Sequence, residues 1–272
     1  MTRFILATAL TLMVSPALAQ AGNPVLLHAA GSLRAAMSEA GQAFESTTAI
    51  KVQGKYGPSG ILKDEIAGGA KAEVFASANT DHPEALAQAK RSGPVVLFAR
   101  NRLCALVRPG VAAKPDTLLE TMLDPRVKLA TSTPKADPSG DYAWEVFRKA
   151  DAVKPGAFAN LDKKALQLTG GAASPPPPAG RNVYGALVAE GKADIFLTYC
   201  TNAVVAKKEN AGQQIVPLPD TLMVGADYGL TVMADASPAA YRLAMFILSA
   251  EGQRILASHG FEAPTLPQGD TK

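Results

Sequence analysis

Histidine and cysteine are scarce in this sequence. Its 272 residues include three histidines and two cysteines, and none of them stands at the spacing of metal ligands. Two cysteines cannot build a disulfide-stapled scaffold. The 27 Lys and Arg against 24 Asp and Glu leave a net charge of +3 with no basic cluster, so we expect no nucleic-acid partner. With 47% hydrophobic and 19% charged residues, the chain is too apolar to be disordered.

Long hydrophobic runs are also lacking. The run at residues 4–14 has about 11 residues, which is too short to span a bilayer. It follows Arg3 and precedes Ala17-Leu18-Ala19, and this combination is typical of a secretory signal peptide. We therefore predict that residues 1–19 are a signal peptide, removed after Ala19 during export.

The two cysteines each lie in an apolar run, at Cys104 and Cys200. An exported protein meets an oxidising compartment, which permits a disulfide. Sequence does not give the Cα separation that decides between a Cys104–Cys200 bridge and two buried thiols, so both alternatives stay open.

Strand-like and helix-like segments alternate along the chain. In the first ninety residues, apolar segments at 25–30, 50–56 and 74–78 are each followed by apolar residues at helical spacing. This pattern predicts a parallel sheet covered by helices, and hence an α/β fold. Two apolar segments, 95–98 and 103–107, follow and are separated by the polar stretch 99–102. Further on, we expect strands at 127–130, 195–199 and 229–233, helices at 115–119, 238–249 and 252–258, helices after Ser139 and from Val183, and a proline-rich loop at 169–180.

A serine recurs where a predicted strand passes into a predicted helix. Ser32, Ser59 and Ser139 all occupy such junctions. The carboxyl ends of parallel strands meet at one edge of a sheet, and helix N-termini there bind anions with their unpaired N–H groups. A simple N-cap role explains each serine by itself, whereas three together favour a small-anion site.

The residues at these junctions resemble those of the periplasmic molybdate-binding proteins. The resemblance covers most of the chain from Val25 to Phe261, and its clearest motifs are Ala29-Ala30-Gly31-Ser32-Leu33, Tyr56-Gly57-Pro58-Ser59-Gly60, Pro138-Ser139-Gly140-Asp141-Tyr142-Ala143 and Thr198-Tyr199-Cys200-Thr201-Asn202-Ala203.

This resemblance implies a two-lobed type II periplasmic binding-protein fold, each lobe a mostly parallel sheet flanked by helices. Lobe one would comprise residues 24–103 and 230–272, lobe two residues 104–229, with crossover strands near 102–107 and 229–233. It further implies a monomeric periplasmic receptor that delivers its solute to the membrane permease of an ABC importer, performs no chemistry and needs no cofactor.

Carried over by position, the anion ligands would be Ser32 and Ser59 in lobe one and Ser139, Val183 and Tyr199 in lobe two. Ser139 and Val183 would donate at least through their backbone N–H groups. Ser32 and Ser59 are also the residues assigned to the metal oxyanion itself. A set of pure donors suits a fully deprotonated tetrahedral dianion, here molybdate or tungstate, whereas phosphate keeps a proton near neutral pH and needs an acceptor.

Other ligands and another class of protein stay open at this point. Tyr142 and Trp144 could stack on a small organic acid, and Arg181, which adjoins Val183, could add a charge; sulfate is a further alternative. Asp137 and Asp141 flank Ser139 and would repel a dianion if they point inward. A secreted serine hydrolase with Ser59 as nucleophile is disfavoured, because the nucleophile-elbow spacing fails.

Overall fold

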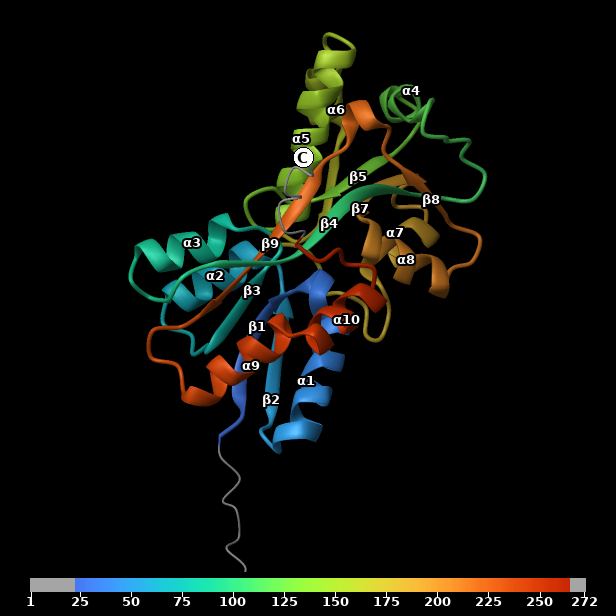
Figure 1. The fold of residues 1–272 in the computed structure, drawn as a ribbon. Coiled ribbons are helices and arrows are strands. Elements are labelled where there is room, and N and C mark those ends of the chain that lie inside the picture. Colours follow the sequence, from blue (N-terminus) through green and yellow to red (C-terminus); the bar gives the residue numbers. More distant parts are fainter. Residues whose placement is uncertain (1–22, 265–272) are drawn as a thin grey trace, which may run out of the picture.

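The computed structural model describes residues 23–264, so the predicted signal peptide lies outside the described residues. Figure 1 shows the chain as two groups of strands, each flanked by helices. The strands are β1 Val25–Ala30, β2 Val52–Gly57, β3 Val74–Ser77, β4 Val96–Val107, β5 Leu129–Ser132, β6 Leu166–Thr169, β7 Ile195–Tyr199, β8 Gln214–Pro217 and β9 Gly225–Val232. The helices are α1 Arg34–Thr48, α2 Ser59–Ala67, α3 Asp81–Gln88, α4 Leu118–Leu123, α5 Pro138–Val153, α6 Ala157–Lys164, α7 Val183–Ala189, α8 Cys200–Glu209, α9 Pro238–Leu248 and α10 Ala250–Ser258, with 3-10 turns η1 Gly31–Leu33 and η2 Asp220–Leu222.

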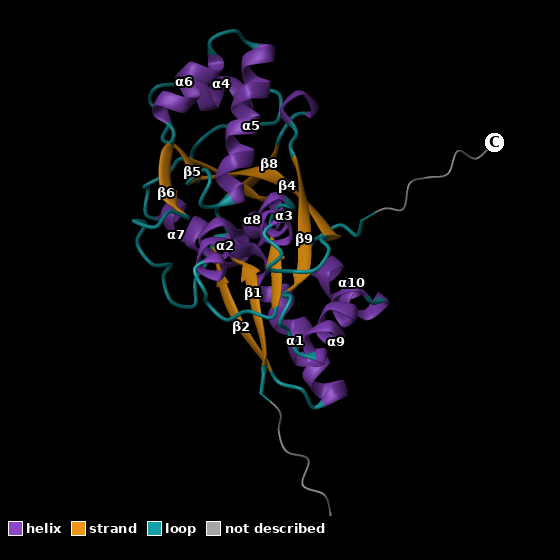
Figure 2. Cartoon of the chain, turned by 90° about the vertical axis from the view of Figure 1, so that its left-hand side faces the viewer, coloured by secondary structure: helices purple, strands orange, loops and turns teal. Residues whose placement is uncertain are grey.

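The N-terminal strands form the expected parallel arrangement. β1 lies between β2 and β3 and is parallel to both, with Val25 opposite Val52 and Leu27 opposite Val74. β1 is apolar at nearly every position because both of its faces are covered. Helices α1, α9 and α10 gather along one side of this sheet (Figure 2).

β4 and β9 connect the two groups of strands and run antiparallel beside each other. β9 also pairs with β3, while the second half of β4, from Leu103, pairs with β7. We expected crossover strands near 102–107 and 229–233, and the observed strands cover 102–107 and 229–232 but begin earlier, at 96 and 225.

The two apolar segments before residue 108 and the polar stretch between them form one continuous strand, β4. Its polar centre keeps the strand alternation: Asn101 is buried, whereas Arg100 and Arg102 reach the surface. Arg100 Nε lies 2.9 Å from Asp227 Oδ1, and Arg102 pairs with Glu262. The strand therefore contains two charged residues at its centre, and each of them is paired with a carboxylate.

The second group of strands repeats the parallel pattern. β5 lies between β6 and β7 and is parallel to both, and β8 pairs with β4. The sequence did not predict β6, β8 or α6, since these are short elements with exposed polar positions. The helix expected at 115–119 begins instead at Leu118, because Pro115 and Asp116 form a turn closed by Thr117 N donating to Lys114 O at 3.0 Å.

A disulfide joins Cys104 of β4 to Cys200, the first residue of α8. Their Cα atoms lie 4.9 Å apart, within the range that a disulfide spans. This settles the alternative left open by the sequence in favour of the bridge. Among residues 23–264, no helix has the length and apolarity needed to cross a membrane.

Candidate functional site

Ser59 and Tyr199 meet around the backbone of Ala78. Ser59 is the first residue of α2 and is 1% exposed. Its Oγ accepts a hydrogen bond from Ala78 N at 3.1 Å, and the Tyr199 hydroxyl donates to Ala78 O at 3.4 Å. Because Oγ accepts from the backbone, the Ser59 hydroxyl proton is free for another acceptor. Burial raises the pKa of Tyr199 well above its usual value, so its hydroxyl stays a donor.

Ser32 joins the same region through Tyr228 of β9. The Ser32 Oγ lies 3.0 Å from the Tyr228 hydroxyl, and the Tyr228 and Tyr199 ring centres are 5.6 Å apart. Tyr228 is fully buried, whereas Ser32 is partly exposed in η1. Tyr228 therefore links Ser32 to Tyr199, and Ala78 links Tyr199 to Ser59.

Ser139 lies in the first turn of α5, and its hydroxyl is an unusual group. Its Oγ is fully buried and has no hydrogen-bond partner among the described residues. Its backbone N–H donates to Asp137 Oδ1 at 3.1 Å, because Asp137 is the N-cap of α5. The backbone donor that the sequence assigned to an anion is thus occupied by a carboxylate, and the hydroxyl is the group left unpaired.

Burial raises the pKa of Asp137 to about 6, against the partly compensating hydrogen bond from Ser139 N. The nearby Asp141 carboxylate raises it further. Asp141 itself turns to the preceding loop, where its Oδ1 accepts from Lys135 N at 2.8 Å. Of the two acidic residues beside Ser139, Asp137 is therefore the one whose carboxylate caps α5.

Val183 is the first residue of α7, after the N-cap Asn182. The Asn182 Oδ1 accepts from Gly185 N at 3.0 Å and leaves the Val183 N–H without an intrahelical acceptor. Burial raises the pKa of the next residue, Tyr184, and the Asp137 carboxylate raises it further. The Tyr184 ring packs edge-on against Phe196 of β7, with ring centres 5.1 Å apart.

Gly60 lets backbone segments from the two groups of strands touch. Gly60 N in α2 donates to Ala136 O at 3.0 Å, and a Cβ on Gly60 would lie 2.3 Å from Lys135 O. Gly140 packs closely against the end of β5, since its Cβ would lie 2.7 Å from Ser132 O. The junctions at Ser59 and Ser139 thus combine a hydroxyl with a position where only glycine fits, whereas a Cβ on Gly31 would meet only one atom, at 4.0 Å.

The residues proposed for an organic ligand lie elsewhere or have other partners. Trp144 Nε1 donates to Asp162 Oδ1 at 2.8 Å, and the indole packs on Phe147 between α5 and α6. Arg181 is exposed. Of these three residues, Tyr142 lies beside the candidate site, with its ring centre 6.2 Å from that of Tyr199.

Asn101 and Tyr228 also belong to the candidate site and were not predicted from the sequence. Both come from the connecting strands, and both are buried polar side chains within otherwise apolar strand positions. A polar residue at an inward strand position was the signal that could have revealed them.

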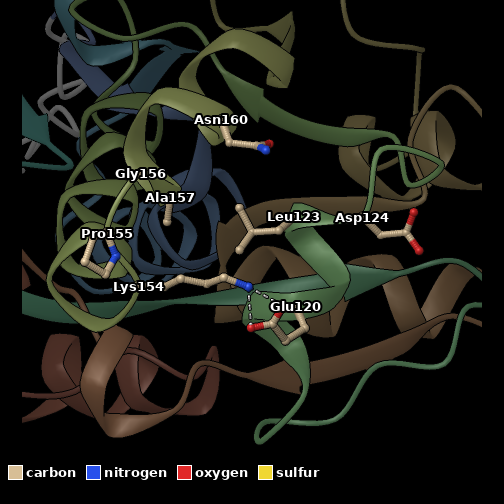
Figure 3. Close-up of a pocket in the computed structure, with 8 residues that line it drawn as sticks. All are labelled: Glu120, Leu123, Asp124, Lys154, Pro155, Gly156, Ala157 and Asn160. Atoms are coloured by element: carbon tan, nitrogen blue, oxygen red, sulfur yellow. Dashed lines mark hydrogen bonds and ion pairs between the residues drawn. The ribbon is translucent and has the colours of Figure 1, made fainter.

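A separate pocket of about 390 Å³ lies between α4 and the start of α6 (Figure 3). Lys154 reaches into it, but Glu120 holds its ammonium at 2.8 Å. The pocket contains none of the predicted ligand residues, and its one lysine is already paired with a carboxylate.

The fold is that of the type II periplasmic binding proteins. The periplasmic molybdate-binding protein of Azotobacter vinelandii superposes with a TM-score of 0.71 at 16% identity, over 89% of this chain and all of that one. The sulfate-binding protein SubI from Mycobacterium tuberculosis gives 0.73 at 18% identity, over 89% and 87% of the two chains.

Sequence comparison gives the family. Residues 25–262 match the profile of bacterial extracellular solute-binding proteins, and the chain belongs to this family. It is 34% identical to the uncharacterized protein PM1146 of Pasteurella multocida, over 86% of this chain and 96% of the relative. It is 26% identical to the molybdate-binding protein ModA of Rhodobacter capsulatus, over 94% of each chain. The resemblance to molybdate-binding proteins found in the motifs is thereby confirmed.

Proposed function

We propose that the protein is the periplasmic receptor of an ABC importer, and that it captures a small tetrahedral oxyanion, molybdate or tungstate, between two lobes. Lobe one is residues 24–103 with 230–272, and lobe two is residues 104–229. The exchange of β4 partners between Arg102 and Leu103 supports this division. Closure on the anion would let a membrane permease distinguish loaded from empty receptor, with no chemistry on the solute.

The observation that carries the proposal is a set of uncharged hydrogen-bond donors whose protons are available to a ligand. Ser59 Oγ already accepts from the backbone, and Ser139 Oγ is buried without a partner. A buried hydroxyl without an acceptor is costly, and an oxyanion supplies that acceptor. Ser32 and the Val183 N–H would join them, and Tyr199 would add its donor once its hydroxyl turns from Ala78 O to the anion. None of these five groups carries a charge, so the ligand must be held by hydrogen bonds and helix N-termini.

Asp137 favours a second candidate, an anion that keeps one proton, such as hydrogen phosphate. Its carboxylate holds the Ser139 N–H and offers an acceptor beside the donors. Molybdate has no proton to give this acceptor, whereas hydrogen phosphate does. Asp137→Asn should therefore strengthen molybdate binding under the first hypothesis and abolish phosphate binding under the second.

The test is calorimetry and thermal shift on the protein beginning at Gln20. The ligands are molybdate, tungstate, sulfate, phosphate and small organic acids, because a ligand of the native state raises the melting temperature by mass action. We expect molybdate and tungstate to bind and sulfate to bind more weakly. Ser59→Ala should weaken binding by about tenfold to a hundredfold, from loss of one hydrogen bond to a charged ligand. Ser46→Ala, at an exposed position on α1, is the matched control.

Binding of an organic acid alone would refute the oxyanion assignment while leaving the receptor role intact. Equal affinity of the Ser59→Ala and Ser46→Ala variants would remove Ser59 from the ligand set.

A further inference from the structure

A chain of hydrogen bonds runs through the connecting strands and ends at Ser32. Asn101 Nδ2 donates to Thr201 Oγ1 at 2.9 Å and to the Tyr228 hydroxyl at 3.4 Å. The Tyr228 hydroxyl in turn lies 3.0 Å from Ser32 Oγ. These links join β4, β9, α8 and η1, elements that are up to 196 residues apart in sequence.

The orientation of the Asn101 amide is fixed by its oxygen. Asn101 Oδ1 accepts from Arg102 N at 2.9 Å, so the other end of the amide must be the NH₂ group. An amide NH₂ only donates, and the Tyr228 oxygen therefore accepts from it.

The Asn101 amide thereby restricts which atoms donate and which accept in the rest of the hydrogen-bond network. Burial raises the pKa of Tyr228, so its hydroxyl keeps a proton. Ser32 Oγ lies 3.0 Å from the Tyr228 hydroxyl and can donate or accept. The Tyr199 hydroxyl also faces Tyr228, and because its own proton is directed to Ala78 O it does not donate to Tyr228. When Tyr228 donates to Ser32 Oγ, the Ser32 proton is left to point away from Tyr228.

We propose that Asn101 and Tyr228 are positioning residues that hold the Ser32 hydroxyl as a donor toward the anion. They thereby select a fully deprotonated oxyanion over one that carries a proton. The inference rests on the proposed function, because it gives Ser32 an anion to meet. The network reaches Thr201 as well, so one amide contacts a hydroxyl of β9 and a hydroxyl of α8.

The test is a double-mutant cycle for molybdate affinity with Ser32→Ala and Tyr228→Phe. Phenylalanine keeps the ring contacts with Phe98, Phe261 and Tyr199 and removes only the hydroxyl. We expect Tyr228→Phe to weaken binding about tenfold in the wild-type background and to have no further effect once Ser32 is alanine. Tyr56→Phe, whose hydroxyl contacts Ser38 instead, is the control.

Asn101→Asp supplies a second readout, since it replaces the donating NH₂ by an accepting oxygen. Tyr228 would then donate to Asp, and Ser32 would be forced to donate to Tyr228. The ratio of molybdate to hydrogen phosphate affinity should fall by about tenfold or more, a change that a general loss of folding would not produce. Melting temperatures without ligand identify any variant that fails to fold.

Additive effects in the cycle, or an unchanged affinity ratio, would overturn this inference while leaving the proposed function in place. If the wild-type protein binds no oxyanion, the proposed function and this inference both fail.

Discussion

Asp137 gives the sharpest prediction about stability, because its environment opposes its charge. Burial raises the pKa of this carboxyl from 3.8 to about 6, and Asp141 raises it further. The group releases its proton less readily in the folded protein than in the unfolded chain. The folded state therefore binds more protons between about pH 4 and pH 6, and stability falls as the pH rises through that window.

The magnitude follows from the size of the shift. A change of about 2 pKa units lowers the free energy of unfolding by about 3 kcal/mol, and the full effect applies above pH 6. Asp137→Asn removes the charge but keeps an oxygen that can cap α5 through the Ser139 N–H. We expect the variant to be more stable than the wild type by about 2 to 3 kcal/mol at pH 7.5, and by much less at pH 4.5.

The assay is urea denaturation of both proteins at the two pH values, without ligand. The quantity of interest is how the free-energy difference between variant and wild type changes with pH. Asp124→Asn serves as a control of opposite sign, because the Arg126 side chain lowers the pKa of Asp124 to about 2. An advantage of Asp137→Asn that is the same at both pH values, or a loss of stability at pH 7.5, would refute the argument from burial.

Two further predictions concern the disulfide and the glycine junctions. Replacing Cys104 and Cys200 by serine should lower the free energy of unfolding by up to about 4.7 kcal/mol, as chain entropy gives for a separation of 96 residues; guanidinium titration measures it, and an unchanged midpoint would contradict it. Gly60→Ala should weaken ligand binding about tenfold or more, because its Cβ would meet Lys135 O at 2.3 Å and keep the two backbone segments apart. Gly31→Ala, with only one atom as close as 4.0 Å, should bind like the wild type in the same calorimetry, and equal affinities for the two variants would argue against a closed contact at Gly60.

The sequence predicted best those elements whose burial is complete. β1 and β7 are apolar at nearly every position because both faces are covered, so a simple apolar run reveals them. The continuity of β4 was not predicted, because the partners of its arginines, Asp227 and Glu262, are more than a hundred positions away. β6 and β8 have exposed positions, and their strand conformation depends on pairing with a neighbouring strand. A local sequence pattern does not reveal that pairing.

The same limit applies to the candidate site, where the sequence motif gives the hydroxyl but not its role. Ser59 is left with a free proton because Ala78 N, 19 residues away, already bonds to its oxygen. The state of Ser32 depends on Tyr228, and through it on the orientation of the Asn101 amide. A serine can donate or accept, and the choice decides whether an anion carrying a proton is accepted or rejected. Ligand class in such a site therefore depends on the partners of each hydroxyl, and these partners come from parts of the chain that the serine motifs do not include.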